Sequence, residues 1–383
     1  MNFDLSKEQR MIRDAVAAFV RDESPVSRFR RMRETERGWE PEVWRQMGDY
    51  GWLAIALPER YGGIGGTFVD LALVLEQLGR GLVPEPLVPS VVLAGGLIER
   101  RGSDAQKAEL LAPLGEGRIS LALAYAERQS RYDLFDCLTR AEATNGGYRL
   151  HGEKTWVLNG HAADWVVVAA RTSGAELDPD GISLFLVPGD AGGLARTAVR
   201  GMDGQRAAFL RFEGVELPAH ARLGDEGDAL GDLEWAIDRG AAAACAEGQG
   251  VLRELFDRTV EYLQQREQFG VKIGTFQALQ HRAADMFAEV ELCQGTMILA
   301  ALQADAADAA QRRGDVSAAK VQLQDGGWFV QSQAIQLHGG VGVTDEQDIG
   351  LYFKRLRVLQ ALFGDADFHV TRCLASPESD PPT

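Results

Sequence analysis

The first third of the chain carries hydrophobic residues at the spacing of one helical face. Ile12, Val16 and Phe19 are three or four positions apart, and Leu71, Leu75 and Leu78 repeat the spacing later, as the printed sequence shows. Because an α-helix turns once every 3.6 residues, side chains at this spacing share one face. The pattern continues to about Leu114, so we predict a helical N-terminal domain over residues 1–116.

The pattern changes near Gly117 to short apolar segments rich in β-branched and aromatic residues. Such segments are 165–170, 182–187 and 209–212. Asn145-Gly146-Gly147 is typical of a tight hairpin turn. These features predict a small β-barrel or sandwich over residues 117–228.

Helical spacing returns after Leu230 and persists over long stretches. Val251, Leu255 and Leu263 indicate one helix, and similar patterns follow over 283–301 and 321–335. Long helices with short connections predict an antiparallel four-helix bundle over 229–375, and the Pro/Ser-rich residues 376–383 are predicted to be disordered. The predicted fold class is mainly α with a central β domain.

The composition limits which classes of binding partner and which cell compartment are expected. The net charge of −16 and the lack of a dense basic segment argue against nucleic acid. No segment has the length and apolarity of a membrane span or the layout of a signal peptide, so we expect a cytoplasmic protein. Four cysteines without paired spacing fit a reducing compartment, and we expect Cys245 and Cys293 in the core and no metal site.

Two segments in the last third combine a fixed cation with glycines. Arg266 is followed by a turn through Gly270, and Gln336 precedes Gly339 and Gly340. An arginine pairs with phosphate through two parallel hydrogen bonds, and glycines let a backbone approach a ligand closely. The alternative is that the first segment is only a helix end. Taken together, the two segments predict a diphosphate clamp.

The order of these domains and several motifs resemble the acyl-CoA dehydrogenase family over essentially the full length. The motifs lie at residues 52–63, 75–79, 152–160, 212–218, 223–224, 266–281 and 336–342. The resemblance implies FAD, an acyl-CoA substrate and an electron-transferring flavoprotein as acceptor. In the implied reaction a carboxylate removes the α-proton while FAD takes a hydride from the β-carbon, which gives the 2,3-enoyl-CoA.

The resemblance also implies roles for individual residues. One group would reach across a subunit interface to the FAD diphosphate of a neighbour: Arg266, Phe269, Gln336 and Gly340, with Gly339 beside them. Trp156 would lie against the flavin ring or the substrate, whereas without the resemblance it would be interpreted as a core residue. Glu127 lies in the counterpart of the family's flavin-facing signature, so we expect it to bind the cofactor.

The sequence departs from the family at positions that serve a subunit's own flavin. Phe363 occupies the usual position of the catalytic glutamate, and Gly240 occupies the position used in a second branch. The flavin-facing signature is reduced at residues 126–133, and Leu158 replaces a threonine. This asymmetry resembles the small subunit of heteromeric acyl-CoA dehydrogenases of the pimeloyl-CoA and steroid side-chain type.

We therefore expect a component of a heterotetramer whose homologous large subunit supplies the base. Assembly with itself as a homotetramer remains an alternative. So do a catalytically silent paralogue and a non-oxidative acyl-CoA enzyme on the same fold. The small residues at 240–244 suggest room for a bulky acyl group.

Two carboxylates of this chain are candidate bases. Glu247 ends an alanine-rich run and could be desolvated with a raised pKa, or could instead pair with an arginine across the bundle. Asp365 could act as a base, or could cap a helix locally. His281 and His338 flank the clamp and could touch the cofactor, although a packed, hydrogen-bonded histidine is the alternative.

Overall fold

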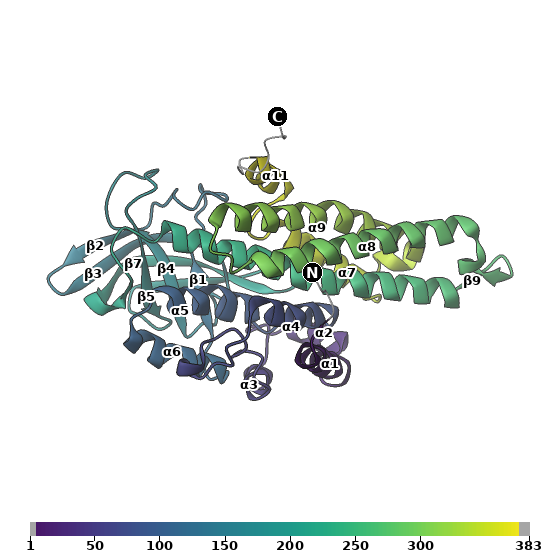
Figure 1. The fold of residues 1–383 in the computed structure, drawn as a ribbon, viewed down its shortest axis with the longest axis horizontal. Coiled ribbons are helices and arrows are strands. Elements are labelled where there is room, and N and C mark those ends of the chain that lie inside the picture. The colour runs from purple at the N-terminus through teal and green to yellow at the C-terminus, as the bar shows by residue number, and fades with distance from the viewer. Residues whose placement is uncertain (1–4, 375–383) are drawn as a thin grey trace. The chain divides into compact units, whose positions relative to one another are not determined.

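The computed structural model describes residues 5–374, and these form two compact units (Figure 1). One unit is helical and comprises residues up to 31, 68–83 and 241 onward. The other contains the sheet and comprises residues 32–67 and 84–240. The predicted domain boundaries stay a prediction, and the segment predicted to be disordered lies outside the described residues.

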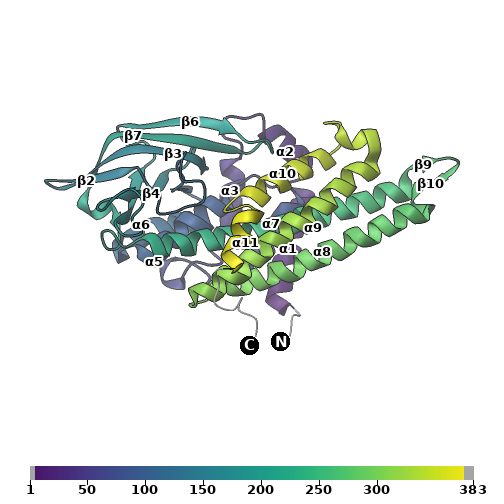
Figure 2. The same ribbon diagram turned by 90° about the horizontal axis from the view of Figure 1, so that it is seen from above.

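The helical unit is built around long helices that lie side by side in both views (Figures 1 and 2). Its elements are α1 (Lys7–Asp22), α2 (Val26–Met32), α4 (Phe68–Arg80), α7 (Leu230–Gln265, of which residues 230–240 belong to the other unit), β9 (Glu267–Gln268), β10 (Val271–Lys272), η4 (Ile273–Thr275), α8 (Gln277–Gln303), α9 (Ala309–His338), η5 (Gly339–Val343), α10 (Ile349–Ala361) and α11 (Ala366–Leu374). The short hairpin of β9 and β10 and the 3-10 turn η4 link α7 to α8.

The start of α1 illustrates how local chemistry fixes a helix boundary. The Ser6 hydroxyl accepts from the backbone N–H of Gln9, and the Gln9 side chain accepts in return from the backbone N–H of Ser6. This capping box satisfies two donors that the first turn leaves open. The predicted apolar face then buries Val16 and Phe19, while Gln9 Nε2 donates to Asp70 of α4 at 2.9 Å. The capped end and the apolar face together dock α1 on α4.

The second unit consists of short helices and one eight-stranded sheet. The strand order is β6-β7-β3-β2-β4-β5-β8, and β1 pairs with β4. The elements are α3 (Pro41–Asp49), η1 (Glu59–Tyr61), η2 (Val88–Gly95), α5 (Gly96–Arg101), α6 (Asp104–Gly115), β1 (Leu121–Ala124), β2 (Arg140–Thr144), β3 (Gly147–Leu158), β4 (Trp165–Arg171), β5 (Ile182–Pro188), β6 (Leu194–Arg200), β7 (Arg206–Pro218), η3 (Ala219–Ala221) and β8 (Arg222–Leu223).

The hairpin predicted at Asn145 joins β2 to β3, with Thr144 paired to Gly147 across it. Inward-facing side chains of β3, β4, β5 and β7 form one apolar core, in which the rings of Tyr148 and Phe185 meet edge to face with centroids 4.8 Å apart. Cys245 and Cys293 are buried, as predicted. The predicted fold class, mainly helical with a central β domain and a C-terminal bundle, is confirmed. Among residues 5–374 no helix is long and apolar enough to span a bilayer.

Candidate functional site

Arg266 directly follows the last residue of α7 and begins the hairpin turn. Its backbone N–H still donates to Tyr262 O at 2.9 Å, and its carbonyl accepts from Ile273, so its backbone is fixed at both ends. The side chain is exposed and forms no ion pair or hydrogen bond with any residue between 5 and 374. A fixed cation with no internal partner can bind an external anion.

The tip of this hairpin presents an aromatic ring to solvent. Phe269 has φ +56° and Gly270 has φ +78°, which closes the turn between β9 and β10. The ring of Phe269 is 92 % exposed and makes an edge contact with Phe276, centroids 6.2 Å apart. The ring is therefore available for contact with a ligand or partner.

The second predicted segment ends α9 and lies next to the first. The rings of Tyr262 and His338 stack with centroids 4.4 Å apart, and this contact joins the last turn of α7 to the last turn of α9. His338 is buried and bonded through Nδ1 to Ala334 O at 2.8 Å, and burial lowers its pKa. It is therefore a packed, hydrogen-bonded histidine, whereas His281 is exposed.

Gln336, Gly339 and Gly340 are exposed at this helix end. A Cβ atom placed on either glycine would meet no other atom within 4 Å, so the backbone of η5 is open to a ligand. Gly339 has φ +63° and ψ −145°, a conformation that side-chain-bearing residues adopt only with strain. The stacking of Tyr262 on His338 thus brings the helix ends that carry both halves of the predicted clamp to one end of the bundle.

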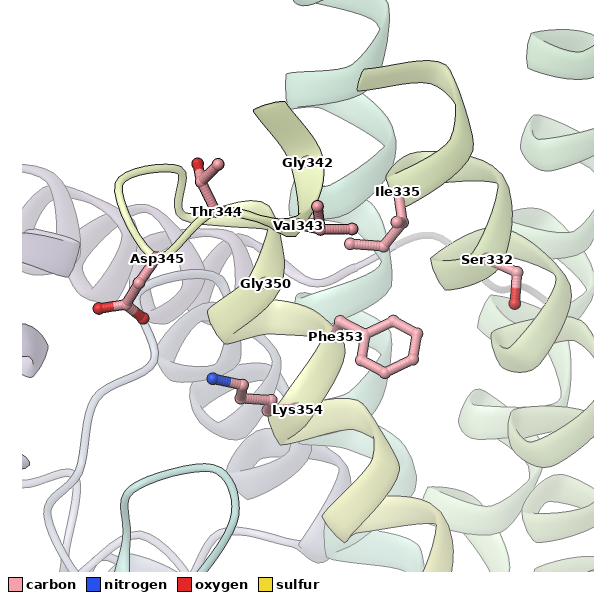
Figure 3. Close-up of a pocket in the computed structure, with 9 residues that line it drawn as sticks. All are labelled: Ser332, Ile335, Gly342, Val343, Thr344, Asp345, Gly350, Phe353 and Lys354. Atoms are coloured by element: carbon pink, nitrogen blue, oxygen red, sulfur yellow. The ribbon is translucent and has the colours of Figure 1, made fainter. Parts of the chain in front are cut away.

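A pocket of about 440 Å³ borders the same glycine turn (Figure 3). Ile335 and Val343 point toward one another above the ring of Phe353, while Asp345 and Lys354 lie on the opposite side. The pocket thus has an apolar wall and a charged edge. It was not predicted from the sequence, because its lining comes from α9, η5 and α10.

Phe363, which the resemblance places at the position of the catalytic glutamate, is buried in the turn between α10 and α11. Phe363 is 4 % exposed and has φ +62°, and its carbonyl oxygen is bonded to Nε2 of His369 at 3.2 Å. Burial lowers the pKa of His369 to about 2, so the ring is neutral. The carboxylate of Asp365 accepts from the backbone N–H of Phe368 at 3.0 Å and caps α11. Asp365 thus makes the local capping contact, which was the alternative to a role as catalytic base.

Lys320 anchors the same segment from α9. Its ammonium group is 1 % exposed and donates to the carbonyl oxygens of Leu359 (2.7 Å), Gln360 (3.1 Å) and Leu362 (2.7 Å). Burial lowers the pKa of Lys320 to about 8. The lysine satisfies carbonyl groups at the end of α10 that have no partner within that helix. Neither Lys320 nor His369 was predicted from the sequence. The carbonyl partners of Lys320 lie about 40 residues away, and the Phe363 carbonyl that contacts His369 lies in an irregular loop.

Glu247 forms a buried ion pair with Arg355. Its Oε1 accepts from Nε of Arg355 at 2.6 Å and its Oε2 from the terminal nitrogen at 2.8 Å. Both side chains are 10 % exposed. This bidentate arrangement uses both oxygens and supports the arginine-pair alternative that we weighed for Glu247. No sequence signal identified Arg355 as the partner, since 108 positions separate the two residues.

The β unit holds the remaining predicted cofactor residues. Trp156 is 39 % exposed and has φ +51°, at a point where β3 and β7 shift register. Glu127 is 5 % exposed, and its Oε1 lies 2.7 Å from Nζ of Lys154. Burial raises the pKa of Glu127, but the ammonium group and hydrogen bonds outweigh this and lower it to about 2. Trp156 is thus available for contact, whereas Glu127 is engaged internally.

Comparisons with known proteins agree with this organisation. Three family models match in order: the acyl-CoA dehydrogenase N-terminal domain at residues 6–118, the middle domain at 122–215 and the C-terminal domain at 230–375. A probable acyl-CoA dehydrogenase, fadE25 of Mycobacterium leprae, is 31 % identical over 82 % of this chain and 81 % of that protein.

Two solved structures extend the comparison. The ChsE4–ChsE5 complex from Mycobacterium tuberculosis contains a chain with a TM-score of 0.89 and 28 % identity, with 100 % of both chains covered. A variant of the Tcur3481–Tcur3483 steroid ACAD has a TM-score of 0.85 and 29 % identity, with 96 % of each chain covered. The chain belongs to the acyl-CoA dehydrogenase family, a family of flavoprotein oxidoreductases.

Proposed function

We propose that this chain is one subunit of a heteromeric, FAD-dependent acyl-CoA dehydrogenase. In this proposal it binds the FAD diphosphate of a homologous large subunit, which supplies the catalytic base. The observation that carries the proposal is the contrast between two positions. Arg266 is exposed and free of ion pairs with residues 5–374, whereas the base position holds the buried Phe363.

The residues of the clamp support binding of a diphosphate. The Arg266 guanidinium would pair with the phosphate oxygens, Gln336 would add a neutral hydrogen bond, and the open backbone at Gly339 and Gly340 would permit close approach. Phe269 would cover an adjoining part of the nucleotide. When bound, FAD supplies the hydride acceptor for oxidation of the acyl group.

The base is proposed to come from the partner because no candidate in this chain is poised to take a proton. Glu247 is held by Arg355 through both oxygens, and this bidentate contact restricts the movement of the carboxylate and occupies the atoms that would take a proton. Asp365 caps a helix. Two similar structures are the ChsE4–ChsE5 complex and the Tcur3481–Tcur3483 steroid ACAD, each with two components, which supports a partner-dependent assembly.

Purification of the chain alone and together with a co-expressed large subunit tests the proposal. We expect the isolated chain to contain far less than one FAD per chain and to lack dehydrogenase activity. The complex should be yellow and should oxidise an acyl-CoA when electron-transferring flavoprotein is present. Stoichiometric FAD and full activity in the isolated chain would overturn the proposal and favour a self-sufficient homotetramer.

A further inference from the structure

A buried ion pair in the β unit joins three segments of the chain. Lys154 is 0 % exposed and lies on β3, and its Nζ donates to Glu127 Oε1 at 2.7 Å and to Tyr125 O at 3.1 Å. The first segment, residues 125–127, follows β1, and the second is the part of β3 that contains Lys154. The pair therefore fixes the end of one strand against the middle of another.

The carboxylate of Glu127 brings in the third segment. Its Oε2 accepts from the backbone N–H of Leu138 at 2.8 Å, and its Oε1 accepts from that of Thr139 at 3.0 Å. The Gln129 amide also donates to Oε2 at 3.0 Å. With Lys154 included, the carboxylate has donors on both oxygens inside the protein. A carboxylate used in this way has little capacity left for an external ligand.

Trp156 lies two residues after Lys154 in a conformation that needs support. Lys154 pairs with Leu210 and Val157 with Ala208, so Thr155 and Trp156 lie opposite the single residue Phe209 and form a β-bulge. Trp156 has φ +51°, a region that residues other than glycine seldom occupy unless surrounding contacts enforce it. The neighbouring Thr155 N–H donates to Ala126 O at 2.8 Å.

The Glu127–Lys154 pair and the Thr155–Ala126 bond thus lie directly beside the bulge, where they can enforce the backbone conformation of Trp156. The ion pair holds the residues before the bulge onto segment 125–127, so the chain reaches Trp156 with its direction already fixed. The ring then projects from the sheet and stays 39 % exposed. Without the pair, β3 can return to an ordinary extended conformation, in which Trp156 turns away from its present position.

We propose that Glu127 and Lys154 are positioning residues that hold Trp156 in its left-handed conformation, and that neither touches the cofactor. This inference rests on the proposed function only for the flavin that Trp156 would contact. It replaces the cofactor-binding role expected for Glu127, and it assigns a role to Lys154, which had none.

The first test uses the chain without cofactor. The near-UV circular dichroism and acrylamide quenching of Trp156 are obtained as the difference between each protein and its Trp156→Phe counterpart. We expect Lys154→Met and Glu127→Gln each to remove more than half of the Trp156 dichroism and to raise its quenching constant at least twofold. The matched control, Arg149→Met, removes an exposed cation from the same strand and should leave both signals unchanged.

The double variant Glu127→Leu with Lys154→Met separates positioning from stability. It removes both buried charges, so it should unfold at a higher temperature than either single variant. Its Trp156 signals should nevertheless stay lost, because the bond from Thr155 to Ala126 is then left to hold β3 against segment 125–127 without the side-chain pair. If a folded single or double variant keeps the wild-type dichroism and quenching of Trp156, the positioning role is refuted.

A second measurement tests the flavin contact of Trp156 separately from the positioning role of the ion pair. In the complex with the large subunit, Trp156→Phe should raise flavin fluorescence at least twofold if the indole lies against the flavin, and Lys154→Met should reproduce that rise. No rise with Trp156→Phe would refute the flavin contact, while the measurements on the isolated chain would still decide whether the ion pair positions Trp156.

Discussion

Replacing Glu247 by glutamine distinguishes an ion-pair residue from a catalytic base. The carboxylate bonds Arg355 through both oxygens at 2.6 and 2.8 Å, in a site where each side chain is 10 % exposed. Glutamine has nearly the same shape but no charge, and its single carbonyl oxygen can accept only part of the bidentate interaction. The substitution therefore leaves the Arg355 guanidinium buried with incomplete compensation.

The expected magnitude follows from these contacts. A hydrogen bond between charged groups contributes about 1.5–3 kcal/mol, and removing one partner of a buried pair costs about 3–5 kcal/mol in total. Because glutamine keeps one acceptor, we expect Glu247→Gln to lower the free energy of unfolding by about 2–4 kcal/mol. The pair of Arg253 and the exposed Glu291 provides a control, and Glu291→Gln should cost less than about 1 kcal/mol.

Urea unfolding of Glu247→Leu, of Arg355→Met and of the double variant that combines them measures the free energy of the interaction directly. We expect the double variant to lose at least about 2 kcal/mol less than the sum of the single losses, as for contacting charges. In the complex at a temperature where the protein stays folded, Glu247→Gln should retain turnover within about threefold. A variant with wild-type stability but a hundredfold lower turnover would show that Glu247 is the base and refute this reasoning.

Three further outcomes are expected. First, folded His369 stays neutral because its pKa is lowered to about 2, whereas the unfolded chain takes up a proton below about pH 6.5. Stability should therefore fall by up to about 1.4 kcal/mol per pH unit below 6.5, and urea unfolding of His369→Gln should show a flatter pH profile. Second, Lys320→Met should cost about 2–4 kcal/mol in thermal or urea unfolding, since carbonyl groups at the end of α10 lose their donor, and an unchanged value would contradict the capping role. Third, Gly339→Ala should cost about 1–3 kcal/mol because of its left-handed φ, while Gly340→Ala should leave unfolding unchanged and weaken FAD binding by the complex; equal stability losses would count against this assignment.

The sequence predicted the clamp because its chemistry is local. Arg266 and the glycines at 339 and 340 are recognisable within short segments, and the helix spacing on either side indicates that both segments end helices. The stacking of Tyr262 on His338, which brings these helix ends together, could not be read from the sequence. A pattern of apolar positions identifies the buried face of a helix but not its neighbour.

Interactions between distant residues account for what the sequence did not predict. Arg355 lies 108 positions from Glu247, so the sequence left an arginine partner as one of two alternatives without naming it. Glu127 was expected to bind the cofactor because it belongs to a flavin-facing segment. Its pairing with Lys154, 27 positions away on β3, depends on how β3 packs against the residues after β1.

Asp365 shows where local reasoning sufficed. A short carboxylate just before a helix commonly caps it, and the structure places its oxygen 3.0 Å from the backbone N–H of Phe368. The left-handed backbone of Phe363 was not expected from its sequence, since phenylalanine carries no preference for positive φ. That conformation results from the tertiary contacts of His369 and Lys320 with the neighbouring carbonyl groups.

The affinity of the assembled complex for FAD after Arg266→Ala tests the central claim most directly. Because the Arg266 side chain forms no bond with residues 5–374, the variant should unfold within about 0.5 kcal/mol of the wild type and should still bind its partner. Loss of a charged bond to phosphate, about 1.5–3 kcal/mol, predicts FAD binding about 10- to 150-fold weaker. Arg10→Ala, which removes another exposed cation, should leave the affinity unchanged. An unaltered FAD affinity for Arg266→Ala in an intact complex would contradict the account.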